Sequence, residues 1–328
     1  MGDPLKGLIA RAACAVALLA LATPLRAQGT TLLTVSDTTL FPEGVVRDAA
    51  RSRWLLSSIR QRTIVAVDDA GGVTPFARDL PGDVGAIFGM QVDAARGALY
   101  AASGAVPQML RYAPADTLRA EILEFDLASG VLRRRIALPD APRQRMPGDL
   151  LVTRDGTVYV SDAMAQRVYV IPRDGPVRVV TSPLFRSLQG IVISPDEHTL
   201  IVADYSNGLV RIPLAGSDSI AMITDTAGRR IQGLDGLLWH GDALIATYNG
   251  RRPGRVMRIS LTADLRNIAA VATLETVAGV GEPTLGVILG DAFIFIANSP
   301  WSAFDEKGAR VPGSMLAPPE LRRLPLTP

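Results

Sequence analysis

The chain has 328 residues, of which 34 are basic, 32 acidic, two histidine and one cysteine, and 48% are hydrophobic. This length suffices for one large domain or two ordinary ones with a sizeable apolar core. Three of the basic residues and one of the acidic residues lie in residues 1–27, which leaves 31 of each sign in the remainder. A body without net charge has no electrostatic footprint for nucleic acid or an anionic membrane, so we set both partners aside.

The cysteine and histidine counts restrict the chemistry further. Cys14 is the only cysteine, so residues 28–328 contain no disulfide, thiol nucleophile, cysteine-ligated zinc or iron–sulfur cluster. His198 and His240 are too few for a histidine-rich metal site. Acid–base chemistry therefore falls to carboxylates, tyrosines, basic residues or a metal-bound water.

Residues 1–27 have the pattern of a secretion signal. Lys6 and Arg11 precede an apolar run from Ala12 to about Leu21 that is too short to span a bilayer, and small residues follow it. We expect cleavage after Ala27 and a periplasmic or secreted mature protein, with a single domain over residues 28–328. An uncleaved membrane anchor is the alternative interpretation.

The rest of the chain is built from six similar segments. Each has an apolar strand, a short polar turn rich in Asp and Gly, and a second apolar strand. The strands are apolar on both faces, as expected where sheets stack face to face. The segments begin at Glu43, Phe88, Gly148, Gln189, Asp235 and Leu285.

Further strands follow these hairpins, for example residues 63–69 and 167–175, and shorter fourth strands such as residues 177–182 come next. Four antiparallel strands repeated six times predict an all-β fold, a six-bladed β-propeller. The last repeat offers only one later strand, near Glu320. The N-terminal strand at residues 30–36 is therefore predicted to complete that blade and close the ring.

This fold predicts where the polar residues at the repeat starts gather. The innermost strand of each blade begins beside the central channel, so these residues converge around one mouth of that channel. Glu43, Asp149, Gln189 and Asp235 would supply carboxylate and amide oxygens, the ligands of a hard cation such as Ca²⁺ or Mg²⁺. Such an ion could polarise a carbonyl group or activate a bound water. The structural alternative is that these side chains bond backbone groups at the strand ends in a hydrated channel.

Loops at residues 104–120 and 298–319 share this mouth, and Arg145, Tyr205 and Trp301 are the candidate substrate-binding residues there. The abundance of arginine also has a compositional explanation, because the chain has only two lysines.

The two histidines fall in turns between first and second strands, on the opposite face, where we expect them to be solvated. A Ser-His-Asp triad is therefore not expected. Trp54 and Trp239 are expected to pack between blades.

Four segments, FPEGVV, GDLLVTRDGTVYVSD, QGIVISPDEHTLIVAD and GLDGLLWHGDALIATYN, resemble the family of senescence marker protein, gluconolactonase and luciferin-regenerating enzyme. The resemblance covers about residues 40–300. It implies a six-bladed propeller and a hydrolase that depends on calcium or another divalent metal and acts mostly on sugar lactones.

The resemblance also implies a ligand set: a Glu in the first blade, two Asn at later strand starts, and an Asp that serves in acid–base catalysis. The Glu falls on Glu43 in FPEG and the Asp on Asp235 in LDG. The two Asn fall on Gly148 in PGD and Gln189 in LQG. Gly148 has no side-chain ligand, whereas Gln189 carries an amide oxygen one methylene further out. Asp149 or a water would fill the gap.

Three functional hypotheses follow. The first is an exported, metal-dependent hydrolase, a monomer that opens lactones or esters of small-molecule substrates with a metal-activated water, with calcium as the metal and Asp235 as the base. The second is a non-catalytic periplasmic propeller that binds a ligand or partner protein through loops 104–120 and 298–319. The third is an enzyme forming carbon–carbon or carbon–nitrogen bonds, as in related plant propellers, with a single glutamate for which Glu282 is the only extra candidate.

Overall fold

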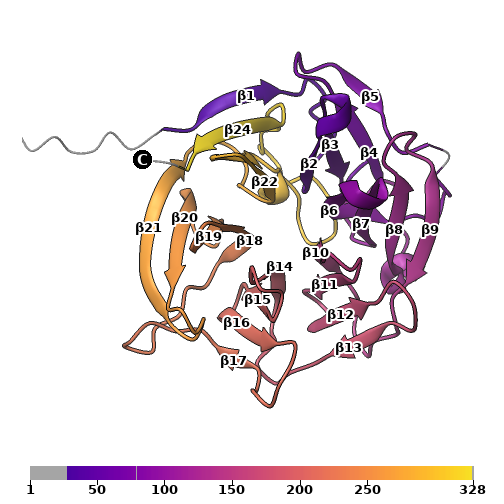
Figure 1. Ribbon diagram of the computed structural model, residues 1–328. Helices are drawn as coiled ribbons and strands as arrows, with labels where there is room; N and C mark the ends of the chain where they lie inside the picture. Colours follow the sequence, from indigo (N-terminus) through magenta and orange to yellow (C-terminus); the bar gives the residue numbers. More distant parts are fainter. Residues whose placement is uncertain (1–27, 79, 327–328) are drawn as a thin grey trace, which may run out of the picture.

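A computed structural model describes residues 28–78 and 80–326 and shows six four-stranded sheets arranged in a ring (Figure 1). The segment predicted to be a secretion signal, residues 1–27, lies outside the described residues. Every pairing between neighbouring strands of a sheet is antiparallel. The described part of the chain contains no α-helix, only short 3₁₀ turns, and no helix long and apolar enough to cross a membrane. The prediction of an all-β, six-bladed propeller is confirmed.

The first three blades follow one another in chain order. Blade 1 consists of β2 (Val45–Asp48), β3 (Arg53–Ser58), β4 (Thr63–Val67) and β5 (Val73–Pro75). Blade 2 consists of β6 (Ala86–Asp93), β7 (Ala98–Gly104), β8 (Ala120–Asp126) and β9 (Leu132–Ala137). Blade 3 consists of β10 (Pro147–Val152), β11 (Val158–Asp162), β12 (Arg167–Ile171) and β13 (Arg178–Val180).

The remaining three blades complete the ring. Blade 4 consists of β14 (Leu188–Ile193), β15 (Thr199–Asp204), β16 (Gly208–Pro213) and β17 (Ala221–Met222). Blade 5 consists of β18 (Leu234–His240), β19 (Ala243–Tyr248), β20 (Gly254–Leu261) and β21 (Ile268–Val277). Blade 6 consists of β22 (Gly286–Leu289), β23 (Ala292–Ile296), β24 (Glu320–Pro325) and β1 (Thr30–Thr34).

The ring is closed by strands from both ends of the described chain. The N-terminal strand β1 pairs with β24, so it forms the outermost strand of the sheet whose other strands come from the C-terminal part. In Figure 1 the indigo β1 lies against the yellow β24. This is the predicted closure, and it joins blade 6 to blade 1 without leaving the last sheet one strand short.

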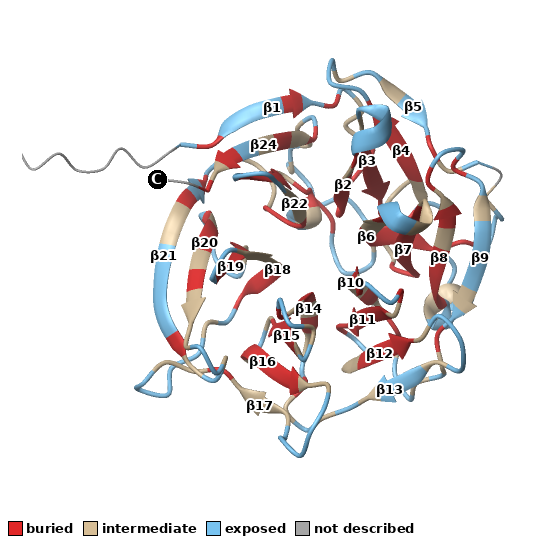
Figure 2. Cartoon of the chain, in the orientation of Figure 1, coloured by how far each residue is buried: buried red, intermediate tan, exposed pale blue. Residues whose placement is uncertain are grey.

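Buried side chains form six apolar clusters, and each cluster lies between two neighbouring blades. The cluster between blades 3 and 4, for example, contains Leu151 and Tyr159 from one sheet and Leu188 and Leu200 from the other. Figure 2 shows buried residues along the inner strands and exposed residues along the outer strands, such as β9 and β13. The inner strands are apolar on both faces because each face packs against a different blade.

The two faces of the disc differ in what they carry. We call the face where the first strand of each blade begins the top face, and the face with the turns between first and second strands the bottom face. The turns at the bottom include the 3₁₀ segments Ala49–Arg51 and Ala94–Arg96. The top face carries the longer loops, with the 3₁₀ segments Pro114–Leu118 and Trp301–Ala303.

The first strands of four blades are interrupted by a β-bulge near the top face. The register shifts lie between Ile87 and Met90, between Pro147 and Asp149, between Leu188 and Ile191, and between Leu234 and Leu237. A bulge leaves residues out of the ladder and re-aims their side chains, and bulges are over-represented beside functional sites. Two of the polar residues at the repeat starts, Gln189 and Asp235, lie in these bulges.

Hydroxyl groups of the second strands accept backbone N–H groups in this region. Thr247 Oγ1 accepts a hydrogen bond from the N–H of Gly236 at 2.7 Å, and Ser57 Oγ accepts one from Gly44 at 2.8 Å. Both hydroxyl-bearing residues are fully buried. The hydroxyls therefore satisfy buried donors that the strand ladder leaves free.

The repeated Asp at the end of the second strand has a structural role. In blade 4 the Asp204 carboxylate accepts hydrogen bonds from the backbone N–H groups of Arg186 at 2.6 Å and Ser187 at 3.2 Å. In blade 3 Asp162 Oδ1 accepts one from Met146 at 3.0 Å. The bonded segments lead directly into β10 and β14, so these buried carboxylates fix the entry of the first strand into the channel region.

We predict that replacing Thr247 by Val lowers the free energy of unfolding by about 1–3 kcal/mol. Valine has nearly the same shape but leaves the buried N–H of Gly236 without an acceptor. Urea unfolding followed by circular dichroism measures the change. The control Thr247→Ser keeps the hydroxyl and should be clearly less destabilised. Equal losses in the two variants would show that the hydrogen bond is not the source.

Candidate active site

A cavity of about 190 Å³ lies on the top side of the central channel. It is lined by Glu43, Phe88, Met146, Gly148, Asp149, Gln189, Gly190, Tyr205, Asp235, Asn249, Glu282, Leu285 and Trp301. We call it the upper cavity. The first residues of all six repeats therefore meet in one place, as the propeller topology predicts, together with two of the three candidate substrate-binding residues.

Glu43 reaches this cavity from the segment that leads into β2. Its carboxylate Oε2 accepts a hydrogen bond from Trp301 Nε1 at 2.7 Å, and its main-chain oxygen accepts one from Thr284 Oγ1 at 3.1 Å. Phe41, two residues earlier, packs edge-on against the Trp301 ring with their centroids 4.9 Å apart. Blade 6 and its top loop thus hold the first blade's glutamate in place.

Asp235 enters from the bulge of β18 and is held by a residue of the next strand. Asn249 Nδ2 donates a hydrogen bond to Asp235 Oδ2 at 2.7 Å and another to the main-chain oxygen of Pro283 at 3.1 Å. Because both of these acceptors need a donor, the amide nitrogen must point toward them. Asn249 Oδ1 is buried and has no hydrogen-bond partner among the described residues.

Asp149 occupies the floor of the upper cavity. Its Oδ1 accepts a hydrogen bond from its neighbour's N–H, that of Leu150, at 2.8 Å, and its Oδ2 accepts one from Ile191 at 3.4 Å. The first strands of blades 1, 2, 4, 5 and 6 have glycine at the equivalent position, namely Gly44, Gly89, Gly190, Gly236 and Gly286. Asp149 is therefore the one carboxylate placed in an otherwise side-chain-free ring.

These carboxylates lack the cationic partners that buried carboxylates normally have. Within residues 28–78 and 80–326, no Arg, Lys or His nitrogen lies within 4.0 Å of a carboxylate oxygen of Glu43, Asp149 or Asp235. A buried carboxylate without a counter-charge either takes up a proton or recruits a cation. The site is thus electrostatically incomplete when the carboxylates are ionised.

The pKa values follow from this environment. Burial raises the pKa of Glu43 well above its ordinary range, and the charge of Asp235 raises it further, although the hydrogen bond from Trp301 opposes the shift. Burial likewise raises the pKa of Asp235, and the charge of Glu282 adds to the increase. Burial raises the pKa of Asp149 to about 7. Perturbed carboxylates gathered in one cavity are typical of functional sites.

Glu282 is a fourth carboxylate in the lining. Burial raises its pKa, whereas the charge of Arg252 lowers it. The Arg252 guanidinium donates a hydrogen bond to Ser302 Oγ at 2.7 Å. Glu282 therefore belongs to the outer part of the site, where the charge of Arg252 acts on it.

The donor atoms suit a hard cation that takes oxygen ligands. Among the described residues, no three His, Cys, Asp or Glu side chains are grouped as a metal site, so a cation here would need amide oxygens as well as carboxylates. Asn249 Oδ1 is such an oxygen, and it is buried without a donor. Gln189 Oε1 is another: it faces the space that Gly148 leaves, lying 3.6 Å from where a Cβ on Gly148 would be. Calcium in particular accepts mixed carboxylate and amide oxygens in flexible geometry.

The three candidate substrate-binding residues are placed differently from one another. Tyr205 and Trp301 line the upper cavity. Arg145 does not line it: its side chain is buried, its guanidinium donates a hydrogen bond to the main-chain oxygen of Leu138 at 2.6 Å, and it lies 3.4 Å from Asp140. In this structure Arg145 fastens the segment before β10.

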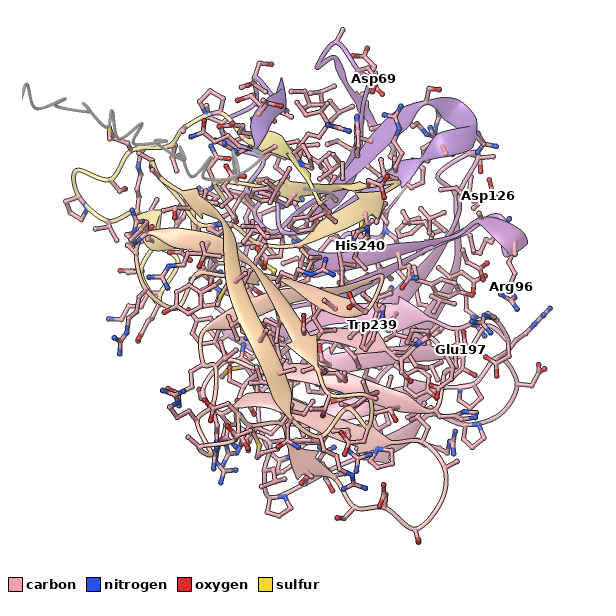
Figure 3. All side chains as sticks on the ribbon, turned by 60° about the vertical axis from the view of Figure 1, so that its left-hand side comes forward. Asp69, Arg96, Asp126, Glu197, Trp239 and His240 are labelled. Atoms are coloured by element: carbon pink, nitrogen blue, oxygen red, sulfur yellow. The ribbon has the colours of Figure 1, made fainter. Side chains whose placement is uncertain are left out.

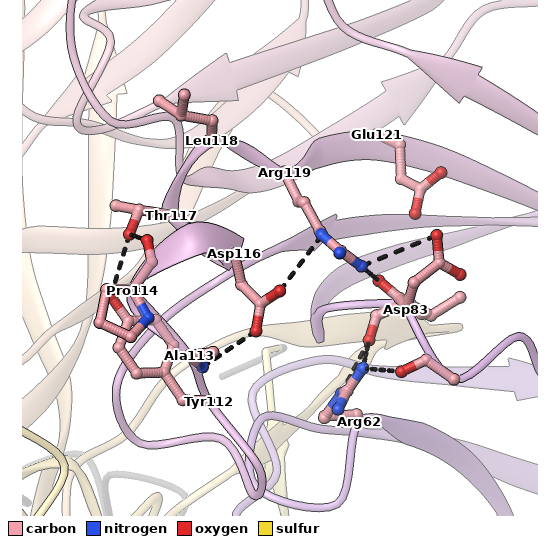
Figure 4. Close-up of polar contacts among 12 residues, drawn as sticks. Arg62, Asp83, Tyr112, Ala113, Pro114, Asp116, Thr117, Leu118, Arg119 and Glu121 are labelled. Atoms are coloured by element: carbon pink, nitrogen blue, oxygen red, sulfur yellow. Dashed lines mark hydrogen bonds and ion pairs between the residues drawn. The ribbon is translucent and has the colours of Figure 1, made fainter.

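Arg119 ties the loop at residues 104–120 both to itself and to Asp83, whose main-chain oxygen accepts a hydrogen bond from the Arg119 guanidinium at 2.9 Å. Arg119 pairs with Asp116 at 3.2 Å, and the N–H of Ala113 donates to the same carboxylate at 3.0 Å (Figure 4). Gln108 Nε2 donates to the main-chain oxygen of Asp305 at 2.9 Å, which ties this loop to the other long loop. The two loops form one connected rim beside the cavity rather than two free arms.

The histidines lie on the bottom face, as predicted. His198 belongs to the turn before β15 and His240 ends β18. Trp54 is buried between blades 6 and 1, whereas Trp239 packs against the cluster between blades 4 and 5 and is only partly buried.

Asn249 is the functional candidate that the sequence analysis missed. It follows the second strand of blade 5, and Tyr205 holds the same position in blade 4, since Asp204 and Tyr248 pair with equivalent residues of their first strands. Aligning the ends of the second strands would have shown that Asn249 and Tyr205 occupy equivalent positions beside the channel. The pattern is hard to recognise because the equivalent residue of blade 3, Ala163, is apolar.

Comparison with known proteins gives the fold a context. No protein-family model matches the sequence, and no curated protein matches it. Among solved structures, a PQQ-bound aldose sugar dehydrogenase from Streptomyces coelicolor is similar with a TM-score of 0.62 at 14% identity, covering 92% of this chain and 99% of that one. The chain has the fold of these propellers.

Solved structures from the family that the sequence motifs resemble are also among the matches. A gluconolactonase from Xanthomonas campestris matches with a TM-score of 0.59 at 16% identity, covering 92% of this chain and 90% of that one. The calcium-binding protein regucalcin from Agrobacterium tumefaciens matches with a TM-score of 0.58 at 19% identity, covering 91% and 93%. At these identities the likeness shows the fold, and the function must be argued from the site.

We predict that the metal-free protein loses stability as the pH rises from about 4 to about 7. Asp149 has a folded-state pKa of about 7, above its unfolded value of about 3.9, so the folded state binds the proton more tightly in this range. The contribution of Asp149 is full below the unfolded pKa and is lost as the pH passes the folded pKa, at up to about 1.4 kcal/mol per pH unit.

Urea unfolding in the presence of a chelator at pH 4.5, 6.0 and 7.5 measures this slope. Asp149→Asn mimics the protonated carboxyl, so its slope should be clearly shallower than that of the wild type. Identical slopes would show that Asp149 titrates normally in the folded protein.

Proposed function

We propose that this protein is an exported, metal-dependent hydrolase that opens lactones or esters of small molecules. The observation that carries the proposal is the pair of buried carboxylates, Glu43 and Asp235. Burial raises the pKa of both, the charge of Asp235 raises that of Glu43 further, and neither carboxylate has a cationic partner in the described chain. The resemblance of the FPEG and LDG motifs to a lactonase family and the gluconolactonase fold of a matched structure support it.

Glu43, Asp235 and the amide oxygens of Gln189 and Asn249 would hold the ion, which we take to be calcium. Asp149 lies close enough for its pKa to respond to the charge of Asp235, so it would lie in or near the coordination sphere. When bound, a divalent cation supplies charge that polarises a substrate carbonyl and lowers the pKa of water.

The chain's own residues would contribute positioning and proton transfer. Asp235 is the base that we propose to take up a proton from the attacking water, and Asn249 fixes the orientation of its carboxylate through the 2.7 Å hydrogen bond. Burial raises the pKa of Tyr205 to about 12, so its phenol stays protonated and can donate a hydrogen bond to a substrate oxygen. Phe88, Met146 and Leu285 provide apolar walls that limit the access of bulk water.

Isothermal titration calorimetry with Ca²⁺ at pH 7.5 tests the cation site, and hydrolysis of a panel of lactones and esters followed by pH-stat tests the activity. We expect Glu43→Gln and Asp235→Asn each to weaken Ca²⁺ binding at least tenfold and to abolish hydrolysis. The control Asp174→Asn changes an exposed aspartate outside the cavity and should behave as the wild type.

A wild-type protein that binds neither Ca²⁺, Mg²⁺, Mn²⁺ nor Zn²⁺ would contradict the metal proposal. Metal binding without hydrolysis of any substrate would favour the non-catalytic ligand-binding propeller instead.

We propose that residues 1–27 direct export and that the mature protein begins at Gln28. Mass spectrometry of the protein recovered from the periplasmic or secreted fraction of a bacterial host should find Gln28 as the N-terminal residue, because Ala27 completes the small-residue cleavage pattern. Ala27→Asp should leave the longer chain uncleaved. Recovery of the full-length wild-type chain from the cytoplasm would contradict export.

A further inference from the structure

The lower part of the central channel contains a second and larger cavity, of about 330 Å³. We call it the lower cavity. The first strands of all six blades line it. The lining residues are Val45 to Arg47, Met90 to Val92, Asp149 to Val152, Ile191 to Ile193, Gly236 to Trp239 and Leu285 to Val287, together with Gly44, Ile245 and Phe293. It shares only Asp149 and Leu285 with the upper cavity.

The lining of the lower cavity is apolar in both its deep and its shallow parts. The deep part contains buried side chains such as Met90 and Leu237. The shallow part contains Val152, Ile193 and Leu238, which are only partly buried although they are aliphatic. The six first strands thus place aliphatic side chains around the axis, and those of the shallow part are left partly exposed.

Apart from the Asp149 carboxylate, the charged and amide side chains of the lower cavity are already engaged. Arg47 forms a bidentate ion pair with Asp69, with distances of 2.7 and 3.1 Å, and its guanidinium lies 4.5 Å over the Trp54 ring. Gln91 Oε1 accepts a hydrogen bond from the N–H of Val152 at 2.9 Å. The cavity therefore presents no free basic group to an anionic ligand.

The lower cavity reaches the bottom face of the disc. Trp239 and Ile193 lie near the ends of their strands, and both side chains are partly exposed. Figure 3 labels Trp239 and His240 together with Arg96 and Glu197, which lie in the corresponding turns of other blades. The Trp239 indole N–H donates to the main-chain oxygen of Gly241 at 2.8 Å, so the ring is fixed at the mouth.

We propose that the lower cavity is a binding site for a small, uncharged aliphatic molecule. Its volume falls at the lower end of the range for ligand pockets, about 300–1,000 Å³, and it is mostly apolar as such pockets are. Apolar cavities half this size exclude water and take up apolar ligands. Three residue steps along a strand correspond to about 10 Å of depth, which suits an extended alkyl chain.

This site is distinct from the upper cavity in chemistry and in location. The upper cavity gathers carboxylates and amide oxygens, whereas the lower cavity offers aliphatic walls and only one carboxylate, that of Asp149, at its inner end. The proposal therefore stands whether or not the upper cavity binds a cation or hydrolyses a substrate.

The chain carries its own reporters for the test, because it has only three tryptophans. Trp239 lines the lower cavity, Trp301 lines the upper cavity, and Trp54 lines neither. The probe is 8-bromooctan-1-ol, an uncharged aliphatic alcohol whose bromine quenches a tryptophan that it contacts. We expect saturable quenching of the wild-type protein. The quenching should persist in Trp301→Phe and disappear in Trp239→Phe.

Two lining variants test the site without changing the reporters. Val152→Asp places a carboxylate in the aliphatic ring, and Val92→Phe fills part of the volume; each should weaken saturable binding of the alcohol at least tenfold, measured by calorimetry. Val271→Asp, on the exposed face of β21, is the matched control and should bind as the wild type. Circular dichroism verifies that each variant is folded. If Val152→Asp unfolds, the substitution of Val92 still tests the site.

Quenching that depends on Trp301 rather than Trp239, or binding that is equally strong in both lining variants, would overturn the proposal. Absence of saturable quenching in the folded wild-type protein would overturn it as well. Repeating the titration with a chelator and with added Ca²⁺ separates this result from the cation site, since neither condition should change the binding of the alcohol.

Discussion

The close approach of six first strands at one axis is the constraint on which the rest of this structure depends. A Cβ atom on Gly44 would lie 2.7 Å from the main-chain oxygen of Phe88, and one on Gly89 would lie 2.7 Å from that of Gly148. Only glycine fits where one blade's strand passes so close to the next. The residue before each of these glycines is pushed toward the axis. Glu43, Gln189 and Asp235 are such residues. They lie close together at the axis although they are far apart in the sequence.

This crowding also explains why the polar site needs so much support. Bulges in the first strands free backbone N–H groups, and buried hydroxyls such as that of Thr247 accept them. The carboxylates of Asp162 and Asp204 then hold the segments that enter the bulges. These carboxylates are satisfied by several N–H groups, whereas Glu43 and Asp235 have few donors and, among the described residues, no cationic partner. Most hydrogen-bond donors near the channel stabilise the strands and loops, and few of them reach the carboxylates of Glu43 and Asp235. This arrangement is expected of a site that binds a cation.

The sequence predicted the propeller and the convergence of the repeat starts because both follow from local patterns. Each hairpin can be recognised from its two apolar strands and the polar turn between them, and six similar units can pack in few ways. The contacts within the site were harder to predict, since they depend on loops between blades. Nothing in the local sequence shows that Trp301 donates to Glu43 across 258 positions or that Asn249 orients Asp235. Its charge makes Arg145 a candidate substrate-binding residue in the sequence, yet its guanidinium donates to the main-chain oxygen of Leu138 and pairs with Asp140, so it fastens its own segment.

Asp149 shows how one substitution in a repeat can divide a channel in two. A Cβ atom on each of the five glycines at the equivalent positions would come within 3.0 Å of a neighbouring atom, so the third blade alone carries a side chain at this position. The Asp149 carboxylate accepts N–H groups of Leu150 and Ile191 and lines both cavities, with polar groups above it and aliphatic side chains below. A carboxylate at this boundary keeps its proton to higher pH because one of its sides faces apolar surface. The boundary between the polar and the apolar half of the channel therefore follows from a single departure from the repeat.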